Sequence, residues 1–282
     1  MKDHSNIYKA SIPNIDIDTI KATLDLHSEE SFVELRAIPF MSKNNYVKIG
    51  YYDDTEKLIV ALKSLDSAHN IYLGLNPRKE ILTHAYQLNT WIEIRDSGGK
   101  AEDIEKISKV LVDLDTKRPH KKVNASDSEI ELTKSNMKPI KEYLSSKGLL
   151  FTEAFSGNGF HLTIETIGYK PTQENETKIQ HFLSFLKQKF ENEFFEVDSG
   201  VFDRPRISRF YGTVSKKGMN TIERPWRLSK IIHKADLSQK FDVLSLFKNE
   251  IDAIQASSNK KYSHHEKNNF PDIVGLFQSE VL

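Results

Sequence analysis

The chain has 282 residues, and its 40 Lys and Arg residues balance 40 Asp and Glu residues, so the formal net charge is zero. This balance gives no overall sign of a nucleic-acid partner, which has to be argued from local clusters of charge. Cysteine is absent, which excludes disulfides, thiolate zinc sites, iron–sulfur clusters and cysteine nucleophiles. Neither an export signal nor an apolar run of membrane-spanning length stands out, so we expect a cytoplasmic protein without a membrane partner.

Strand-like and helix-like segments alternate along the chain. Runs rich in β-branched and aromatic residues predict strands at 31–38, 46–52, 70–78, 90–96 and 110–115. Later strands are expected at 149–156, 160–168, 195–198, 206–213 and 226–233, with a turn at S-G-N-G, residues 156–159. Apolar spacing predicts helices at 54–65, 126–147, 179–190 and 241–254, with Pro139 dividing the second into two pieces. This interleaving predicts an α/β fold with mixed sheets.

The composition changes near the end of the chain. Residues 255–269 are polar and lack apolar periodicity, so we interpret them as a flexible linker. Residues 270–282 are apolar enough to dock on the rest of the chain or to begin a further domain. The folded domain is therefore expected to span residues 1–254.

Two carboxylates stand at alternate positions of one predicted strand. Asp113 and Asp115 in V-L-V-D-L-D point to the same face of an extended chain, where their charges repel. An isolated D-x-D is common at a solvated strand end. The alternative is a pair of ligands for Mg²⁺ or Mn²⁺, since hard divalent cations take carboxylate oxygens and would compensate this repulsion.

A second cluster is S-G-N-G-F-H, which runs from Ser156 to His161. Its two glycines allow left-handed backbone conformations and let backbone N–H groups approach an anion. A plain hairpin explains the same four-residue turn, so this cluster alone is a weak signal.

A third cluster lies between Glu196 and Lys217. Its members of interest are the acids Asp198 and Asp203, then Arg206 and Arg209, and then the pair Lys216 and Lys217. Since Arg206 and Arg209 are three positions apart, they lie on opposite sides of a strand, and we expect one to bind a ligand and the other to pair with an acid. An ordinary charged hairpin is the alternative.

The three clusters complement one another chemically. A metal held by few protein ligands usually completes its coordination shell with phosphate oxygens and water. Arginine, lysine, a histidine and a glycine turn are suited to the triphosphate around such a metal. Together they indicate a nucleotidyl-transfer site.

The order of these motifs resembles the archaeo-eukaryotic primase superfamily. D-x-D on a strand, then S-G-x-G-x-H, then D…R-x-x-R-x-x-G-T-x-x-K, is most similar to the primase-polymerase branch of plasmids, phages and other mobile elements. Upstream, V-E-L-R-A-I, G-Y-Y-D-D and I-Y-L-G-L-N-P-R also follow the order in which these domains begin. The resemblance covers Val33 to Lys217.

The resemblance implies two packed modules, one of them like an RNA-recognition fold, with the catalytic acids at their junction. The metal ligands fall on Asp113, Asp115 and Asp198, which would hold two Mg²⁺ or Mn²⁺ ions that align a 3′-hydroxyl with the α-phosphate of a nucleotide. No zinc is expected. The implied nucleotide-binding residues are His161, Arg209, Lys216 or Lys217, and the glycine turn. Gly159 stands where the family often has serine, so Ser156 is expected to supply the hydroxyl instead.

The implied partners are a single-stranded DNA template, a primer, NTPs or dNTPs, and a helicase or another replication protein. Replication of a mobile element and CRISPR-associated synthesis are both known contexts for such domains. Candidate contacts to the DNA backbone are Arg36, Arg78, Lys117, Arg118, Lys121 and Lys122. For the run from Lys117 to Lys122, a solvated loop is an equally good interpretation.

Two other classes of function stay open. One is a non-catalytic single-stranded-DNA-binding or replication-initiator module, against which the complete set of three acids argues. The other is a metal-dependent nuclease, because three carboxylates alone do not distinguish hydrolysis from transfer. The phosphate-binding residues of the second and third clusters favour a DNA primase or DNA-directed polymerase.

Overall fold

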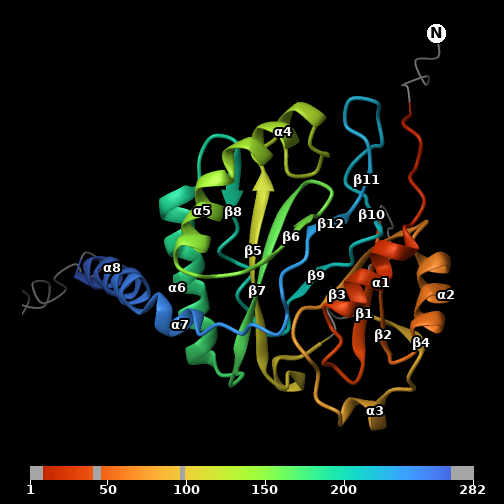
Figure 1. Cartoon of the computed structure of the whole chain (residues 1–282), viewed down its shortest axis with the longest axis horizontal. Coiled ribbons are helices and arrows are strands. Elements are labelled where there is room, and N and C mark those ends of the chain that lie inside the picture. The colour runs from red at the N-terminus through yellow and green to blue at the C-terminus, as the bar shows by residue number, and fades with distance from the viewer. Residues whose placement is uncertain (1–8, 41–45, 96–98, 268–282) are drawn as a thin grey trace, which may run out of the picture.

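The computed structural model describes the backbone of residues 9–40, 46–95 and 99–267, and side chains as far as Ser258. Within these ranges, two five-stranded sheets lie side by side (Figure 1). The mixed α/β class predicted from the sequence is confirmed. No helix in the described ranges combines the length and apolar character needed to cross a bilayer.

The first sheet is built mostly from the N-terminal part of the chain and has the order β4-β2-β1-β3-β9. Its strands are β1 (Val33–Pro39), β2 (Val47–Tyr52), β3 (His69–Gly74), β4 (Thr90–Ile94) and β9 (Ile207–Arg209). One face packs against α1 (Ile17–Asp25) and α2 (Thr55–Leu65), and the short α3 (Leu82–Ala85) follows β3. Helix α2 begins where the Asp54 side chain accepts hydrogen bonds from two backbone N–H groups of its first turn.

The second sheet has the order β12-β6-β7-β5-β8. Its strands are β5 (Ile107–Thr116), β6 (Thr152–Phe155), β7 (Gly159–Tyr169), β8 (Phe195–Val197) and β12 (Lys230–His233). Its main helices are α4 (Asp127–Asn136), α5 (Lys138–Ser146) and α6 (Gln173–Phe190). Strands β5, β6, β7 and β8 with these helices follow a β-α-β-β-α-β path and lie in the spatial order fourth-first-third-second. This topology agrees with the expected RNA-recognition-like module.

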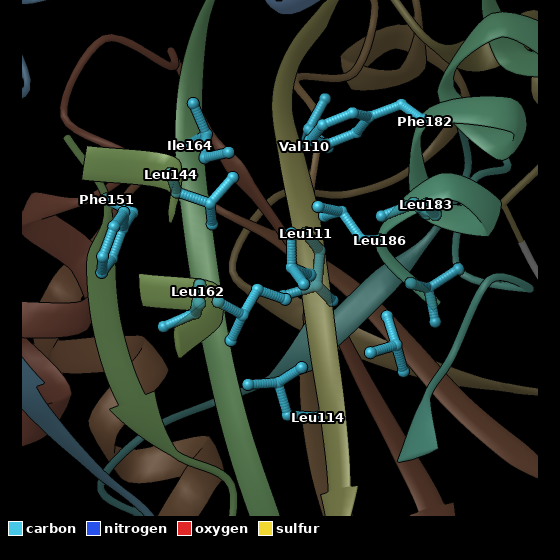
Figure 2. Packing of buried hydrophobic residues seen from close by; sticks show 14 of the residues in the cluster. Val110, Leu111, Leu114, Leu144, Phe151, Leu162, Ile164, Phe182, Leu183 and Leu186 are labelled. Carbon is cyan, nitrogen blue, oxygen red and sulfur yellow. The ribbon is translucent and has the colours of Figure 1, made fainter. Parts of the chain in front are cut away.

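Alternation along β5 separates the core from the site. Val110, Val112 and Leu114 are buried in the apolar core between the sheet and its helices, and Figure 2 shows this packing beside Phe182 of α6. Because successive strand residues point to opposite faces, Asp113 belongs to the other face, which borders the first sheet.

Two predicted elements differ in detail from the structure. Pro139 does divide residues 126–147, but it lies in the first turn of α5, where its missing N–H costs nothing. The predicted strand 226–233 is split into β11 (Arg227–Leu228), which pairs with β10 (Val214–Ser215), and β12. The break falls at the fully buried Ser229, whose N–H and hydroxyl both donate to Thr213 C=O.

The C-terminal region is helical where a linker was expected. After α7 (Val243–Leu246), helix α8 spans Lys248–Lys267 and includes most of residues 255–269. Ile251 and Ile254 are buried on its first turns, and no Gly or Pro interrupts the segment that follows. Residues 268–282, with the segment 270–282, lie outside the described residues.

Candidate active site

A pocket of about 590 Å³ lies between the two sheets. It is lined by residues of all three motif clusters: Asp113, Asp115, Ser156, Asn158, His161, Asp198, Arg206, Arg209, Ser215, Lys216 and Lys217. Lys121 and Lys122 from the basic run also line it. The structure thus brings together side chains that are up to about a hundred positions apart in the sequence.

Strand register aligns the first acid with its neighbours. Asp113 on β5 is the direct antiparallel partner of His161 on β7, and on its other side Asp198 N–H donates to Asp113 C=O at 2.9 Å. Residues paired in this way have neighbouring side chains. Asp115 is opposite Gly159, which has no side chain. The three acids therefore line one end of the pocket floor.

The acids carry negative charge that the protein compensates only in part. Burial, and then the charges of Asp115 and Asp198, raise the pKa of Asp113 well above its ordinary value. Arg118 Nη1 lies 3.7 Å from Asp115 Oδ1, and Asp198 Oδ1 accepts the Gly200 N–H at 2.8 Å. Asp113 is thus the carboxylate that would gain most from a cation.

This donor set fits a hard divalent cation better than zinc, since it offers carboxylate oxygens and no thiolate. Among the side chains described, no three His, Asp or Glu residues form a group that could hold a metal ion by itself. A cation held here would have to draw further ligands from phosphate oxygens and water. Such an open site suits a metal that binds together with a nucleotide.

His161 is buried at the wall of the pocket. Its Nδ1 lies 2.8 Å from the Tyr211 hydroxyl, and its Nε2 lies 3.5 Å from Asp113 Oδ1. Burial, together with the positive charge of Arg209, lowers the pKa of His161 to about 3. The imidazole is therefore neutral at pH 7, and it can bind a phosphate through a hydrogen bond rather than through a positive charge.

The S-G-N-G turn is packed tightly against β5 and β10. Gly157 has φ +102°, and a Cβ there would lie 2.3 Å from Ser215 Cβ. The Asn158 side chain accepts the Ala125 N–H at 2.8 Å and donates to Ser215 Oγ at 3.4 Å. A Cβ on Gly159 would lie 2.3 Å from Leu114 C=O, which explains why serine is absent from this position. Ser156 lines the pocket.

Replacing Gly159 by Ser should destabilise the protein. The new Cβ would push β7 away from β5 beside Asp115, and overpacking of this kind typically lowers the free energy of unfolding by about 1–3 kcal/mol. Urea unfolding of the variant measures the loss. An unchanged unfolding midpoint would mean that the two strands can separate locally without penalty, against the close approach described here.

Arg206 and Arg209 have different partners, as expected, although both side chains line the pocket. Arg206 pairs with Asp203 and donates from Nη2 to Gly200 C=O at 2.6 Å. The Arg209 guanidinium instead stacks over the Tyr72 ring, 4.4 Å from its centroid. Arg209 is therefore the arginine that can serve a ligand.

Lys216 does not present its charge to the pocket. Its Nζ is fully buried and donates to Asp66 Oδ1 at 3.3 Å and to the carbonyls of His69 and Val214 at 3.2 and 3.4 Å. These contacts occupy all three donors of the ammonium group. The assignment of Lys216 to phosphate binding is therefore corrected in favour of Lys217. Burial, and then the nearby charge of Arg118, lower the pKa of Lys217.

Arg36 and Arg78 do not line the pocket, and their expected contact with DNA is wrong. Both are buried, 6% and 4% exposed, and both pair with the buried Glu34. Although burial favours the neutral carboxyl, Arg78 and Arg36 lower the pKa of Glu34 overall. The three charges form an ionic cluster inside the first module.

Two lysines of the basic run after Asp115 form contacts within the protein. Lys117 Nζ donates to Asn192 C=O at 2.7 Å, and Lys121 Nζ lies 3.2 Å from Glu196 Oε2. Lys121 and Lys122 are exposed at the edge of the pocket. A nucleic acid at this pocket could therefore contact these two lysines while it lies close to the three acids.

Several residues of the site were given no role from the sequence. Asn70 and Tyr72 line the pocket and lie outside the three motif clusters, whereas Asn158 and Ser215 line it from within those clusters. Tyr211, whose hydroxyl contacts His161, does not line the pocket. Asn70 and Tyr72 are two apart on β3, and Tyr72 is the direct partner of Arg209 on β9. Because side chains of a strand alternate between its faces, the sequence alone predicts that both lie on one face of β3. The sequence does not show that β3 pairs with β9, and this pairing brings that face to the pocket.

No family model and no curated protein matches the chain. Among solved structures, it is similar to the AEP domain of the primase-polymerase (PrimPol) of cyanophage S-2L, with 12% sequence identity and a TM-score of 0.49. The match covers 84% of this chain and 98% of that one.

Proposed function

We propose that this protein is a template-directed nucleotidyltransferase of the primase or polymerase type. The observation that carries the proposal is the meeting of three carboxylates with His161, Arg209 and Lys217 in one pocket. A pocket lined by carboxylates alone would repel a triphosphate. A pocket that bound the triphosphate through cations alone would have no need of carboxylates. Together they suit a metal–triphosphate complex.

Asp113, Asp115 and Asp198 would hold Mg²⁺ or Mn²⁺, which when bound activates an attacking 3′-hydroxyl and stabilises charge on the departing pyrophosphate. Arg209 would contribute a guanidinium to the phosphates, and Lys217 an ammonium. The neutral His161 would contribute a hydrogen bond at Nε2. The contribution of the protein is positioning and charge stabilisation rather than covalent catalysis.

The pocket also bears on the two alternatives. A module that only binds DNA gains nothing from three carboxylates that line its pocket, since they repel the phosphate backbone. A nuclease needs the acids but has no need to arrange several donors for a triphosphate. The position of Arg209 and Lys217 beside the acids therefore favours transfer over both.

The template strand is expected to pass the exposed lysines at the edge of the pocket. Replacing Lys121 and Lys122 together by Gln should weaken binding of single-stranded DNA about equally for all sequences. It should also flatten the dependence of log affinity on log salt by about 1 to 1.5, since each contact contributes about −0.7. Replacing Lys134 and Lys138, exposed on the helix side of the second sheet, is the matched control. A slope equal to that of the unaltered protein would assign the two lysines to a solvated loop.

Incubation with a labelled primer annealed to single-stranded template DNA, each nucleotide set, and Mg²⁺ or Mn²⁺ tests the proposal. Lengthening of the primer supports it. Shortening of the labelled strand would indicate a nuclease, and DNA binding without any change of length would indicate a non-catalytic module. A parallel reaction without primer distinguishes initiation from extension.

A further inference from the structure

Asn70, which belongs to none of the sequence motifs, bonds to two phosphate-binding elements at once. Its Oδ1 accepts the Lys216 N–H at 2.8 Å and lies 3.3 Å from the donor Nη1 of Arg209. Its Nδ2 donates to Lys216 C=O at 2.9 Å. One amide thus joins β3 to the guanidinium of Arg209 and to the backbone that leads directly into Lys217.

Arg209 is held by neutral groups. Besides Asn70 and the Tyr72 ring, its Nη2 donates to the Tyr72 hydroxyl at 3.2 Å and to Ser215 Oγ at 3.4 Å. Within the described part of the chain, its guanidinium forms no ion pair with a carboxylate. Neutral acceptors fix the direction of an arginine without cancelling its charge, which stays available to an anion.

Asparagine suits this position because both ends of its side chain are used. An acceptor is needed by the Lys216 N–H and by Arg209, and a donor is needed by Lys216 C=O. Aspartate has the same shape but no donor, and its charge would neutralise Arg209. Alanine would leave all three groups without this partner.

We propose that Asn70 is a positioning residue for triphosphate recognition, which orients the guanidinium of Arg209 towards the anion. This inference rests on the proposed function, because it concerns the same site. It predicts that the contribution of Asn70 to triphosphate binding is made through Arg209.

Calorimetric titration of the full chain with dATP and with dAMP, both with Mg²⁺, tests this coupling. Arg209→Ala should weaken dATP binding about 10- to 100-fold, the range for a charge-assisted hydrogen bond, and Asn70→Ala about 3- to 10-fold. In the Arg209→Ala background, Asn70→Ala should cost less than about twofold, since the interaction it supports is already lost. Binding of dAMP should change less than binding of dATP in each variant.

Asn76 provides a matched control. Its Oδ1 likewise accepts from two donors, here the backbone N–H groups of Ser108 and Lys109, and its Nδ2 donates to the carbonyl of Arg204, but it does not line the pocket. Asn76→Ala should lower the thermal midpoint yet leave dATP affinity within about twofold. Asn70→Asp preserves side-chain shape and should bind dATP more weakly than Asn70→Ala does.

Losses that add in the Asn70→Ala/Arg209→Ala double variant would overturn the inference and leave Asn70 a purely structural role. Equal dATP affinity of Asn70→Asp and the unaltered protein would overturn it as well, even if Asn70→Ala failed to fold. Absence of dATP binding by the unaltered protein would instead contradict the proposed function itself, and the role of Asn70 with it.

Discussion

Replacing Asp113 by Asn should reduce nucleotide incorporation to less than about one hundredth of the rate of the unaltered protein, as loss of a central electrostatic group does in other enzymes. The variant should fold normally, because Asn preserves the shape of the buried side chain. Primer extension with Mg²⁺ or Mn²⁺ measures the loss. Asp203→Asn is the matched control, since Asp203 is an acid of the third cluster that pairs with Arg206 and does not line the pocket.

The same substitution should change stability in a direction fixed by the raised pKa of Asp113. Because the folded protein holds this proton more tightly than the unfolded chain, stability is full below the ordinary pKa of Asp and is lost as the pH rises through the raised value. With chelator present, Asp113→Asn should therefore be more stable than the unaltered protein at neutral pH, and the difference should disappear in acid. Added Mg²⁺ or Mn²⁺ should narrow the difference. A variant with near-normal incorporation, or with no gain in stability, would show that the metal assignment is wrong.

Replacing His161 by Ala should weaken nucleotide binding by about tenfold and slow incorporation, since a buried hydrogen-bond donor beside the phosphates is lost. Binding of single-stranded DNA should stay nearly unchanged, because the His161 side chain is only 5% exposed, whereas Lys121 and Lys122 are exposed. Nucleotide titration and DNA titration of one preparation separate the two effects. The matched control is His233→Ala, an exposed histidine on β12 of the same sheet. If DNA binding fell as much as nucleotide binding, His161 would instead have a structural role or contact the template.

The pH dependence distinguishes a neutral from a charged His161. Its pKa falls from an ordinary 6.5 to about 3 in the folded protein, so the unfolded chain binds the proton first as the pH falls. The folded state should therefore lose stability progressively from about pH 6.5 towards pH 3, and His161→Ala should remove that part of the slope. Between pH 6 and 8, His161 should add no pH dependence to nucleotide affinity. Affinity that rises on acidification in the unaltered protein but not in the variant would indicate a charged imidazole.

The face of β5 that lines the pocket could be predicted from the local pattern of residues. In V-L-V-D-L-D the apolar residues and the acids alternate, and a period of two sends Asp113 to the face opposite Val112 whatever the sheet around them. Arg206 and Arg209 have different partners, as expected, but the strand geometry behind that expectation does not hold, because Arg206 precedes β9 and both side chains line the pocket.

Which of the other cations form buried ion pairs could not be predicted, because their partner acids lie far away in the sequence. Lys216 and Lys217 are adjacent, and only the position of Asp66 shows which of the two ammonium groups is buried. Arg78 is neutralised by Glu34, 44 positions earlier, so its charge never reaches the cleft. The order of the motifs along the sequence does not show which acid pairs with which cation.

The supporting residues of the site were missed for a related reason. Asn70 is an ordinary polar strand residue until β9 and β10 are placed beside β3. Its role arises from that packing, since its two partners are 139 and 146 positions away. Asn158 and Ser215 likewise acquire their roles where two hairpins meet.

The most direct test of nucleotidyl transfer at this pocket is to count pyrophosphate released and nucleotides added in one reaction on a primed single-stranded template. The proposed mechanism predicts one pyrophosphate for each nucleotide added, addition of the nucleotide complementary to the template base, and loss of both products in Asp113→Asn. Pyrophosphate release that continues undiminished in Asp113→Asn, or strand cleavage without pyrophosphate in the unaltered protein, would contradict it.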